Sequence, residues 1–246
     1  MTFSNLACSM REDAAIIRLC RPGHPSNALG VPFLSELHSA VEQVRNTEAV
    51  KIVVFAGTDR TFSTGADLDE IKSFSDRDIL EFLRLGQSLL RNIMELGPVT
   101  VAAVNGLALG GGLELALACD IRWAHARAAF GLPEARLGLV PGWGGVELLR
   151  PLVPPPVYEQ MISGAGFVTA RRAYETGLVS RVYASVDFDG EVLSEAVRIT
   201  ATGADFRAEI KRAARSEKSD IDLASANERF LSLWNKPERK MRLSRK

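Results

Sequence analysis

Cysteine and net charge are both scarce in this sequence, and each scarcity excludes a class of protein. The 246 residues hold three cysteines, Cys8, Cys20 and Cys119, without a Cys-x-x-Cys spacing, so neither a disulfide framework nor a zinc cage is indicated. Thirty basic residues balance thirty acidic ones, so no overall field attracts nucleic acid or an anionic membrane surface. We therefore expect a reduced, cytoplasmic protein that holds any anionic ligand by local contacts.

The patterns of a secretion signal and of a membrane span are also missing. Charged residues interrupt the apolar positions at the start of the chain, so we expect that segment to belong to the mature fold. Residues 99–117 form a largely apolar run near the length of a bilayer span. They include Asn105, Glu114 and several glycines, and a carboxylate near mid-bilayer is costly. We expect a buried strand, a turn and a helix there instead.

Familiar metal, nucleophile and cofactor motifs are absent as well. His24, His38 and His125 are scattered without metal-ligand spacing, so no metal site is expected. The sequence has no Gly-x-Ser-x-Gly elbow and no P-loop. The glycines at positions 106, 110, 111 and 112 do not follow the dinucleotide pattern Gly-x-Gly-x-x-Gly, which disfavours a Rossmann oxidoreductase.

Alternating strand and helix patterns predict an α/β fold. Alternating or continuous apolar runs predict strands at residues 14–20, 51–56 and 99–104, with weaker candidates at 120–124 and 178–182. Apolar residues spaced by three and four predict helices over residues 34–44 and 79–94. A strand, helix, strand order of this kind implies right-handed crossover connections.

The pattern changes near residue 190, and this divides the chain into two parts. We expect a core over residues 1–189 and a C-terminal helical subdomain over residues 190–246. Helices of the second part are predicted at residues 192–200, 206–214 and 221–234. Because no flexible linker separates the parts, the subdomain should pack on the core or on a partner subunit. The last residues, 236–246, carry six basic residues against one acid, which fits a solvated tail or a contact with a ligand phosphate.

Two glycine-containing turns are candidates for an oxyanion hole. Residues 64–67 follow the strand at 51–56, and residues 110–114 follow the strand at 99–104, each ahead of a predicted helix start. Glycine lets a backbone amide approach a ligand closely, and a helix N-terminus adds partial positive charge. The amides of Ala66 and Gly111 could stabilise one developing oxyanion. A tight connection without any ligand explains such turns about as well.

Glu114 and Glu134 are candidates for acid and base catalysis. Glu114 lies in the apolar start of a helix, where its carboxylate could simply accept hydrogen bonds from nearby amides. Glu134 follows Pro133 in a shaped loop, and a lone glutamate in a loop is usually exposed. As a pair held in different environments, the two carboxylates could divide the acid and base roles.

A third glycine-rich turn, residues 138–145, surrounds Trp143 with four glycines. Backbone of this composition packs closely against something flat or bulky. Because residues 146–152 can be helical, a helix N-terminus that needs no ligand explains the turn nearly as well.

Taken in order, these segments resemble the enoyl-CoA hydratase/isomerase family, also called the crotonase superfamily. The matching stretches are residues 25–29, 62–68, 103–106, 110–112, 114–115, 119–120, 130–134, 138, 141–142 and 173–182. Each is weak alone, but the ordered set covers most of the chain. The resemblance implies a spiral of repeated β-β-α units with a C-terminal helical part used in trimer formation, often as a dimer of trimers. It also implies a coenzyme A thioester as the substrate, with no separate cofactor.

The resemblance also assigns roles to individual residues. Ala66 and Gly111 would supply the oxyanion-hole amides, while Glu114 would act mainly on the water and Glu134 mainly on the transferred proton. Substrate contacts are implied at Asn27, Ala28, Ala66, Asp67, Leu68, Asp69, Gly110, Gly111, Pro133, Gly142 and Trp143. The implied reaction is the syn addition of water across a 2-enoyl thioester, as in fatty acid metabolism.

Three positions depart from the family pattern and leave the exact reaction open. Trp143 stands where a small residue is common, so it could shorten or reshape the acyl pocket. Glu147 replaces a frequent glutamine, as a helix-start residue or a third acid/base group, and Asp69 replaces a frequent lysine. An isomerase, a decarboxylase or a thioester hydrolase on the same fold is the main alternative. A non-catalytic relative that binds acyl-CoA or RNA is another, for which the basic tail is the only hint.

Overall fold

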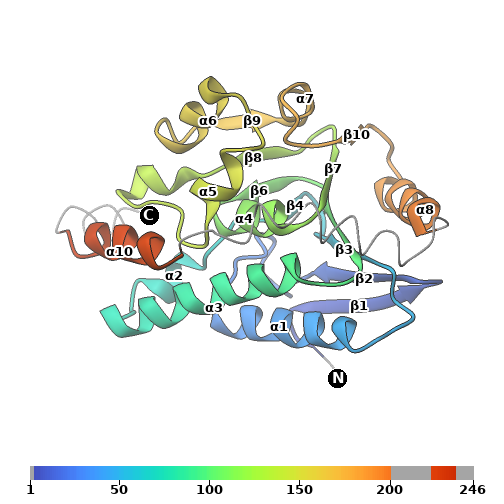
Figure 1. Ribbon diagram of the computed structural model, residues 1–246, viewed down its shortest axis with the longest axis horizontal. Coiled ribbons are helices and arrows are strands. Elements are labelled where there is room, and N and C mark those ends of the chain that lie inside the picture. Colours follow the sequence, from blue (N-terminus) through green and yellow to red (C-terminus); the bar gives the residue numbers. More distant parts are fainter. Residues whose placement is uncertain (1–2, 201–222, 237–246) are drawn as a thin grey trace.

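The computed structural model describes residues 3–200 and 223–236, which form two sheets with helices packed around them (Figure 1). The larger sheet has the strand order β1-β2-β3-β5-β7-β10, and the smaller one has the order β4-β6-β8-β9. The larger sheet consists of β1 (Leu6–Arg11), β2 (Ala14–Leu19), β3 (Ile52–Ala56), β5 (Val99–Val104), β7 (Ile121–His125) and β10 (Arg181–Tyr183). The smaller sheet consists of β4 (Thr61–Ser63), β6 (Leu107–Leu109), β8 (Ala129–Gly131) and β9 (Phe167–Thr169).

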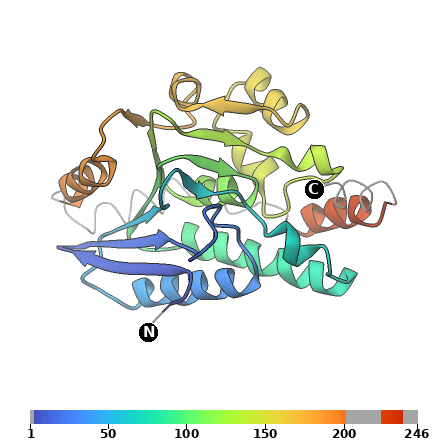
Figure 2. The same ribbon diagram turned by 180° about the vertical axis from the view of Figure 1, so that it is seen from behind.

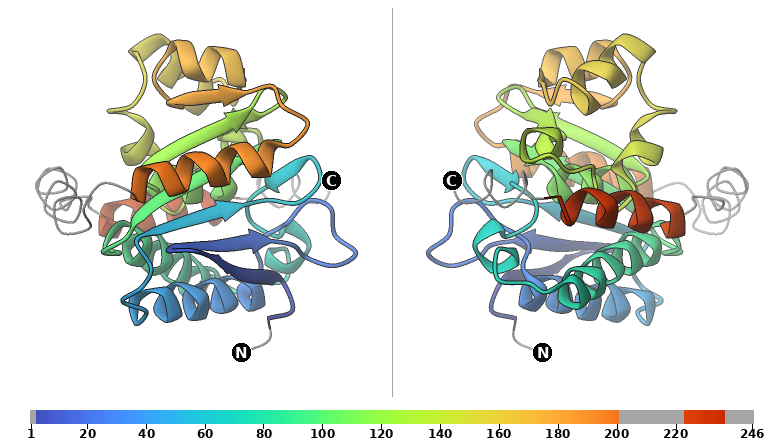
Figure 3. Two further views of the ribbon diagram at one scale, coloured as in Figure 1. Left: turned by 90° about the vertical axis from the view of Figure 1, so that its right-hand side faces the viewer. Right: turned by 90° about the vertical axis from the view of Figure 1, so that its left-hand side faces the viewer.

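The helices gather around these sheets. Their bounds are α1 (Val31–Arg45), α2 (Leu68–Ile71), α3 (Asp76–Met94), α4 (Gly111–Ala118), α5 (Gly145–Leu149), α6 (Pro155–Ile162), α7 (Ala170–Glu175), α8 (Phe188–Thr200) and α10 (Leu223–Trp234), with a 3₁₀ turn at Pro133–Leu137. Helices α1 and α3 pack side by side below the larger sheet, as the view from behind also shows (Figure 2). The end-on views place α8 and α10 at opposite ends of the molecule (Figure 3).

A repeated unit of two strands and a helix builds this arrangement. In the units β3-β4-α2, β5-β6-α4 and β7-β8-3₁₀ turn, the first strand joins the larger sheet and the second joins the smaller one. The strands β3, β5 and β7 are parallel neighbours, as are β4, β6 and β8. The predicted α/β spiral of β-β-α units is therefore confirmed. Because equivalent ends of parallel strands meet at one edge of a sheet, the loop after β4 is brought beside the loop after β6.

Both faces of the central strands β3 and β5 are buried, which explains their continuous apolar runs. In β3, Val53 and Phe55 belong to the cluster that includes the apolar stripes of α1 and α3. Ile52 and Val54 point to the opposite side and join a second cluster with Phe188 of α8. The alternation follows from the two-residue period of a strand. Helix α8 therefore covers a face that the core helices leave open.

Most elements lie where the sequence predicts them, and the last strand is the main exception. The strand predicted at residues 178–182 is displaced to β10, because Leu178 and Val179 are buried in the turn after α7. In that turn the amide of Val179 donates to the carbonyl of Ala173, and Gly177 takes a positive φ of 84°. Leu178 and Val179, which the apolar pattern assigned to the strand, therefore belong to the turn.

The apolar run at residues 99–117 is divided among β5, β6 and all of α4 except its last residue. Over the part of the chain that the structure describes, no helix is long and apolar enough to cross a membrane.

The C-terminal region is helical where it is described. The helix predicted at residues 192–200 lies within α8, and the one predicted at 221–234 is described from Leu223 as α10. The helix predicted at 206–214 and the basic tail from 237 onward lie outside the described residues. The division into a core and a subdomain for oligomer contacts stays a prediction.

Candidate active site

The loop after β4 directs the Ala66 amide away from its neighbouring chain. Ala66 pairs with Leu29 in an isolated parallel bridge. In that bridge the amide of Leu29 donates to the carbonyl of Gly65 across 2.8 Å, and the amide of Asp67 donates to the carbonyl of Leu29 across 3.1 Å. The bridge is thus made through the residues on either side of Ala66. Its own N–H therefore points away from Leu29, and Ala66 lines the cavity described below.

The Gly111 amide begins helix α4 on the neighbouring loop. As the first helical residue, Gly111 has an N–H without an intrahelical partner. The two loops are in close contact, because a β-carbon added to Gly65 would lie 2.8 Å from the Gly111 nitrogen and 2.7 Å from the Leu109 carbonyl oxygen. Gly65 also has a φ of 88°, which a side chain would strain. The glycine at position 65 therefore allows the loops that carry the Ala66 and Gly111 amides to lie in close contact.

The Glu114 carboxylate is buried and held by backbone amides. Its residue is 2% exposed, and Oε1 accepts hydrogen bonds from the amides of Trp143 at 2.8 Å and Gly145 at 2.7 Å. Burial, with a smaller contribution from the nearby charge of Glu147, raises the pKa of Glu114 to about 7, against the lowering effect of the two amides. Glu114 does accept amide hydrogen bonds, but they come from the glycine-rich turn before α5 and not from its own helix.

The Glu134 carboxyl group lines the same cavity as Glu114 and is close enough for the two charges to interact. It lies in the 3₁₀ turn Pro133–Leu137, and its Oε2 is buried with no hydrogen-bond partner among the described residues. Burial and the charge of Glu114 raise the pKa of Glu134 to about 8. The expectation that a lone loop glutamate is exposed does not hold for this side chain, since the turn directs it inward. Each charge disfavours ionisation of the other group, so the pair releases its protons in two separate steps.

One cavity of about 760 Å³ collects these groups. The predicted residues that line it are Ala28, Ala66, Asp67, Leu68, Asp69, Gly110, Gly111, Glu114, Pro133, Glu134, Gly142 and Trp143. The lining includes the apolar side chains of Ile79, Phe82 and Leu83 of α3 and also the charged side chains of Arg21 and Arg136. A long ligand with an apolar tip and an anionic remainder fits such a lining.

Asn27 is the one predicted contact residue that does not line the cavity. It is fully buried at a φ of 46°, and its amide group donates to the carbonyls of Thr61 and Phe62 while its Oδ1 accepts from the Arg21 amide. The side chain ties the loop before α1 to strand β4. Asn27 therefore shapes the wall of the cavity from behind.

Several cavity residues were not predicted from the sequence. Arg21 forms an ion pair with Asp67 at 2.5 Å. Burial alone would raise the pKa of Asp67, but this ion pair and two backbone amides outweigh it and lower the pKa. Arg136 lies over the ring of Phe167 at 4.9 Å, and Phe230 reaches the cavity from α10. No sequence motif predicts these residues, because they reach the cavity from segments that are distant in the sequence.

The two remaining departures from the family pattern lie at the edges of the site. Glu147 is on α5 and forms an ion pair with Arg229 of α10, and it is not among the cavity-lining residues. Asp69 pairs with Lys72 at 2.7 Å, one helical turn away on α2. Glu147 therefore acts as a tie to the C-terminal helix, close enough for its charge to affect Glu114.

Comparison with known proteins places this cavity in a family. The model of the enoyl-CoA hydratase/isomerase family matches residues 10–241. The chain belongs to the enoyl-CoA hydratase/isomerase family. It is 36% identical over 231 residues to a crotonyl-CoA hydratase of Syntrophomonas wolfei, an alignment that covers 93% of this chain and 88% of that protein. It is also 36% identical to a short-chain-enoyl-CoA hydratase of Clostridium acetobutylicum, over 74% of this chain and 70% of that protein.

Solved structures agree with membership in the enoyl-CoA hydratase/isomerase family. An enoyl-CoA hydratase/isomerase from Xanthobacter autotrophicus Py2 superimposes with a TM-score of 0.90 at 31% identity, covering 99% of this chain and 93% of that one. The family predicted from the ordered motifs is confirmed, and with it an enzyme of this family. The roles assigned to single residues stay predictions.

Proposed function

We propose that this enzyme is an enoyl-CoA hydratase that adds water syn across the double bond of a 2-enoyl-CoA thioester. One observation carries the proposal: two buried carboxyl groups with raised pKa values line one cavity, and Glu114 accepts hydrogen bonds from two amides of a distant turn while Oε2 of Glu134 has no partner among the described residues. Near neutral pH this difference favours an ionised Glu114 beside a protonated Glu134. A hydration needs both a base and an acid at the same moment.

The reaction follows from this division of roles. The thioester oxygen accepts hydrogen bonds from the Ala66 and Gly111 amides, which stabilise the enolate by about 3 to 4 kcal/mol per donor. Glu114 takes a proton from water as the water oxygen bonds to C3, and the π electrons move through C2 toward the thioester oxygen. Glu134 then gives its proton to C2 as the carbonyl re-forms. Proton exchange with water returns both carboxyl groups to their starting states.

The charged residues of the cavity lining support a coenzyme A thioester as the substrate. Arg21 and Arg136 carry the positive charge that a phosphate-bearing ligand needs, while the apolar lining from α3 suits an acyl group. Both guanidinium groups are already oriented, Arg21 by Asp67 and Arg136 by the Ala165 carbonyl across 2.8 Å. The names of the relatives from Syntrophomonas wolfei and Clostridium acetobutylicum support the same class of substrate.

Hydration is tested with crotonyl-CoA in water labelled with heavy oxygen. The expected product is 3-hydroxybutyryl-CoA carrying one labelled oxygen, detected by mass spectrometry together with loss of the conjugated thioester absorbance. Migration of the double bond of a 3-enoyl-CoA without uptake of label would instead indicate an isomerase. Binding of acyl-CoA without any turnover would favour the non-catalytic alternative and contradict the proposal.

Assembly as a homotrimer or a dimer of trimers rests on the family resemblance. Light scattering of the purified full chain would measure it, and a monomer at micromolar concentration would contradict it.

A further inference from the structure

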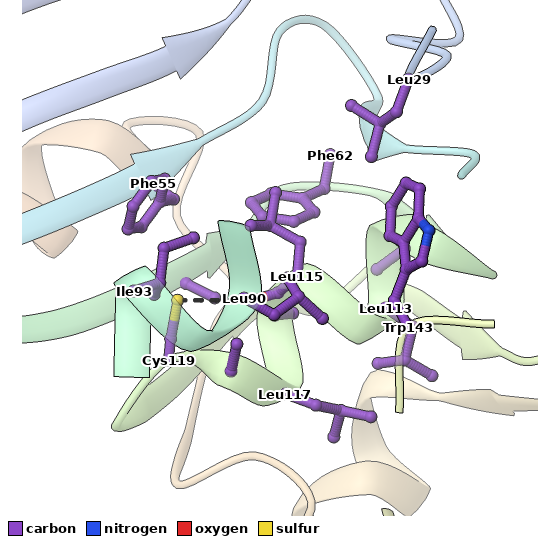
Figure 4. Close-up of a cluster of buried hydrophobic side chains, with 14 of the residues drawn as sticks. Leu29, Phe55, Phe62, Leu90, Ile93, Leu113, Leu115, Leu117, Cys119 and Trp143 are labelled. Atoms are coloured by element: carbon purple, nitrogen blue, oxygen red, sulfur yellow. Dashed lines mark hydrogen bonds between the residues drawn. The ribbon is translucent and has the colours of Figure 1, made fainter. Parts of the chain in front are cut away.

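The indole of Trp143 is part of the cavity wall and is built tightly into the fold. Trp143 is 4% exposed, and its ring centroid lies 5.4 Å from that of Phe82 on α3. Figure 4 draws the indole within the buried cluster that also contains Leu113 and Leu115 of α4. Its backbone amide is held by Glu114 at 2.8 Å. The indole therefore has a fixed position in the cavity wall beside Phe82 of α3.

Two glycines make room for this indole. A β-carbon added to Gly86, in the interior of α3, would overlap Cε2, Nε1 and Cδ2 of Trp143. A glycine in the middle of a helix costs about 1 kcal/mol relative to alanine. A β-carbon added to Gly111 would overlap Cζ3 of the same ring. Positions 86 and 111 thus both lack a side chain where the indole lies.

The position of the indole relative to the reacting carbons follows from Gly111. The proposed reaction places the thioester oxygen at the Gly111 amide, so the carbonyl carbon lies beside this residue. The indole contacts the same residue and closes the space between α3 and α4. An acyl chain that leaves the carbonyl toward α3 meets the ring after a short distance.

We propose that Trp143, seated on Gly86 and Gly111, ends the acyl channel and restricts the enzyme to short acyl groups such as butyryl and crotonyl. The inference rests on the proposed function, because it places an acyl thioester in this cavity. It makes Trp143 a specificity-determining residue through its side chain, while its backbone amide serves Glu114. The wall cannot yield easily, because Phe82 also packs against the ring.

The test measures the binding of saturated acyl-CoAs, which requires no turnover. Isothermal titration would compare butyryl-, hexanoyl-, octanoyl- and decanoyl-CoA on the wild type and on Trp143→Leu. In an open apolar channel each added methylene improves affinity by about fourfold. We expect the affinity of the wild type to stay constant or to fall when the acyl chain is longer than butyryl. In Trp143→Leu, the preference for octanoyl-CoA over butyryl-CoA should increase by at least about tenfold.

Trp123→Leu is the matched control. Trp123 is 3% exposed, but it lies in the other core cluster beside Tyr183 and does not line the cavity. The Trp123→Leu variant loses the same side-chain atoms as Trp143→Leu. It therefore measures the general effect that a large cavity in the core has on acyl-CoA binding. Its chain-length preference should match that of the wild type. A change equal to that of Trp143→Leu would overturn the proposal.

A milder pair of variants keeps the test valid if Trp143→Leu does not fold. Trp143→Phe keeps an aromatic ring. Its preference for octanoyl-CoA over butyryl-CoA should lie between those of the wild type and of Trp143→Leu. Gly86→Ala forces a β-carbon into the indole and should destabilise the wild type more than it destabilises the Trp143→Phe background. Equal destabilisation of the two backgrounds would contradict the fit between positions 86 and 143.

The outcomes separate this inference from the proposed function. If the wild type binds acyl-CoAs of every length with affinities that continue to rise, the channel is open and the inference is wrong, while hydration stands. If hydration is not observed but binding stops at short chains, the inference stands and the reaction is wrong. If no acyl-CoA binds at all, both are wrong.

Discussion

The backbone amide of Trp143 donates to Oε1 of Glu114 across 2.8 Å. On the other side of the same peptide group, the carbonyl of Gly142 accepts a hydrogen bond from the side chain of Gln87 across 2.8 Å. Gln87 is 5% exposed on α3, and its Nε2 also donates to Asn227 of α10 across 2.7 Å. One peptide group therefore connects the proposed base to two distant helices.

Gln87 is expected to position Glu114 through this peptide group. Gln87→Leu leaves the buried Gly142 carbonyl without its donor, which costs about 1 to 3 kcal/mol. The loosened peptide holds Glu114 less well, so kcat/KM for crotonyl-CoA should fall by about tenfold. Because the Trp143 amide lowers the pKa of Glu114, the acid limb of the pH profile should also move to higher pH.

Gln43→Leu is the control for this prediction, since Gln43 is an exposed residue of α1. It should change neither kcat/KM nor the acid limb. A Gln87→Leu enzyme that loses stability but keeps the wild-type pH profile would show that Gln87 has a structural role only.

For the wild type, kcat/KM should depend on pH in a bell-shaped profile, whose acid and alkaline limbs are set by the two carboxyl groups. Below about 7 the base Glu114 becomes protonated, and above about 8 the acid Glu134 loses its proton. Activity therefore falls on both sides of a narrow optimum, measured as kcat/KM for crotonyl-CoA across the neutral range. A rate that is flat from acid to alkaline pH would refute the assigned division of roles.

The ion pair between Glu147 and Arg229 should tune the base from outside the cavity. The charge of Glu147 raises the pKa of Glu114, so Glu147→Gln should shift the acid limb to lower pH. Arg229→Ala leaves the Glu147 charge unpaired and should shift the same limb to higher pH.

The control for the ion pair is Arg77→Ala, which breaks the pair between Arg77 and Glu81 on the surface of α3 at 2.9 Å. It should leave the acid limb unchanged. Shifts of equal sign for Glu147→Gln and Arg229→Ala would mean that docking of α10, and not charge, controls the limb.

The sequence predicts the parts of this fold in which local pattern and burial agree. Strand β5 and helix α3 lie close to their predicted positions, because continuous apolar runs and a regular apolar stripe mark them clearly. The strands β4 and β6 have three residues each, too few for a two-residue period to appear. These short strands separate the predicted turns from the strands before them.

The candidate site divides in a similar way. Ala66, Gly111 and Glu114 lie on turns and a helix start that can be recognised locally, and the family motifs fix their order. The inward direction of Glu134 and the approach of Phe230 depend on contacts between distant segments, which no local pattern records. The amides that hold Glu114 come from residues 143 and 145, about thirty positions further along the chain.

Kinetics of the Glu114→Gln and Glu134→Gln variants on crotonyl-CoA test the central claim most directly. Each single variant should lose about a hundredfold or more in kcat/KM. The double variant should have a kcat/KM only slightly below that of the less active single variant, because the two groups act in one reaction step. Glu81→Gln, an exposed carboxylate of α3, should keep full activity. Full activity in either Glu114→Gln or Glu134→Gln, in a folded enzyme, would contradict the account.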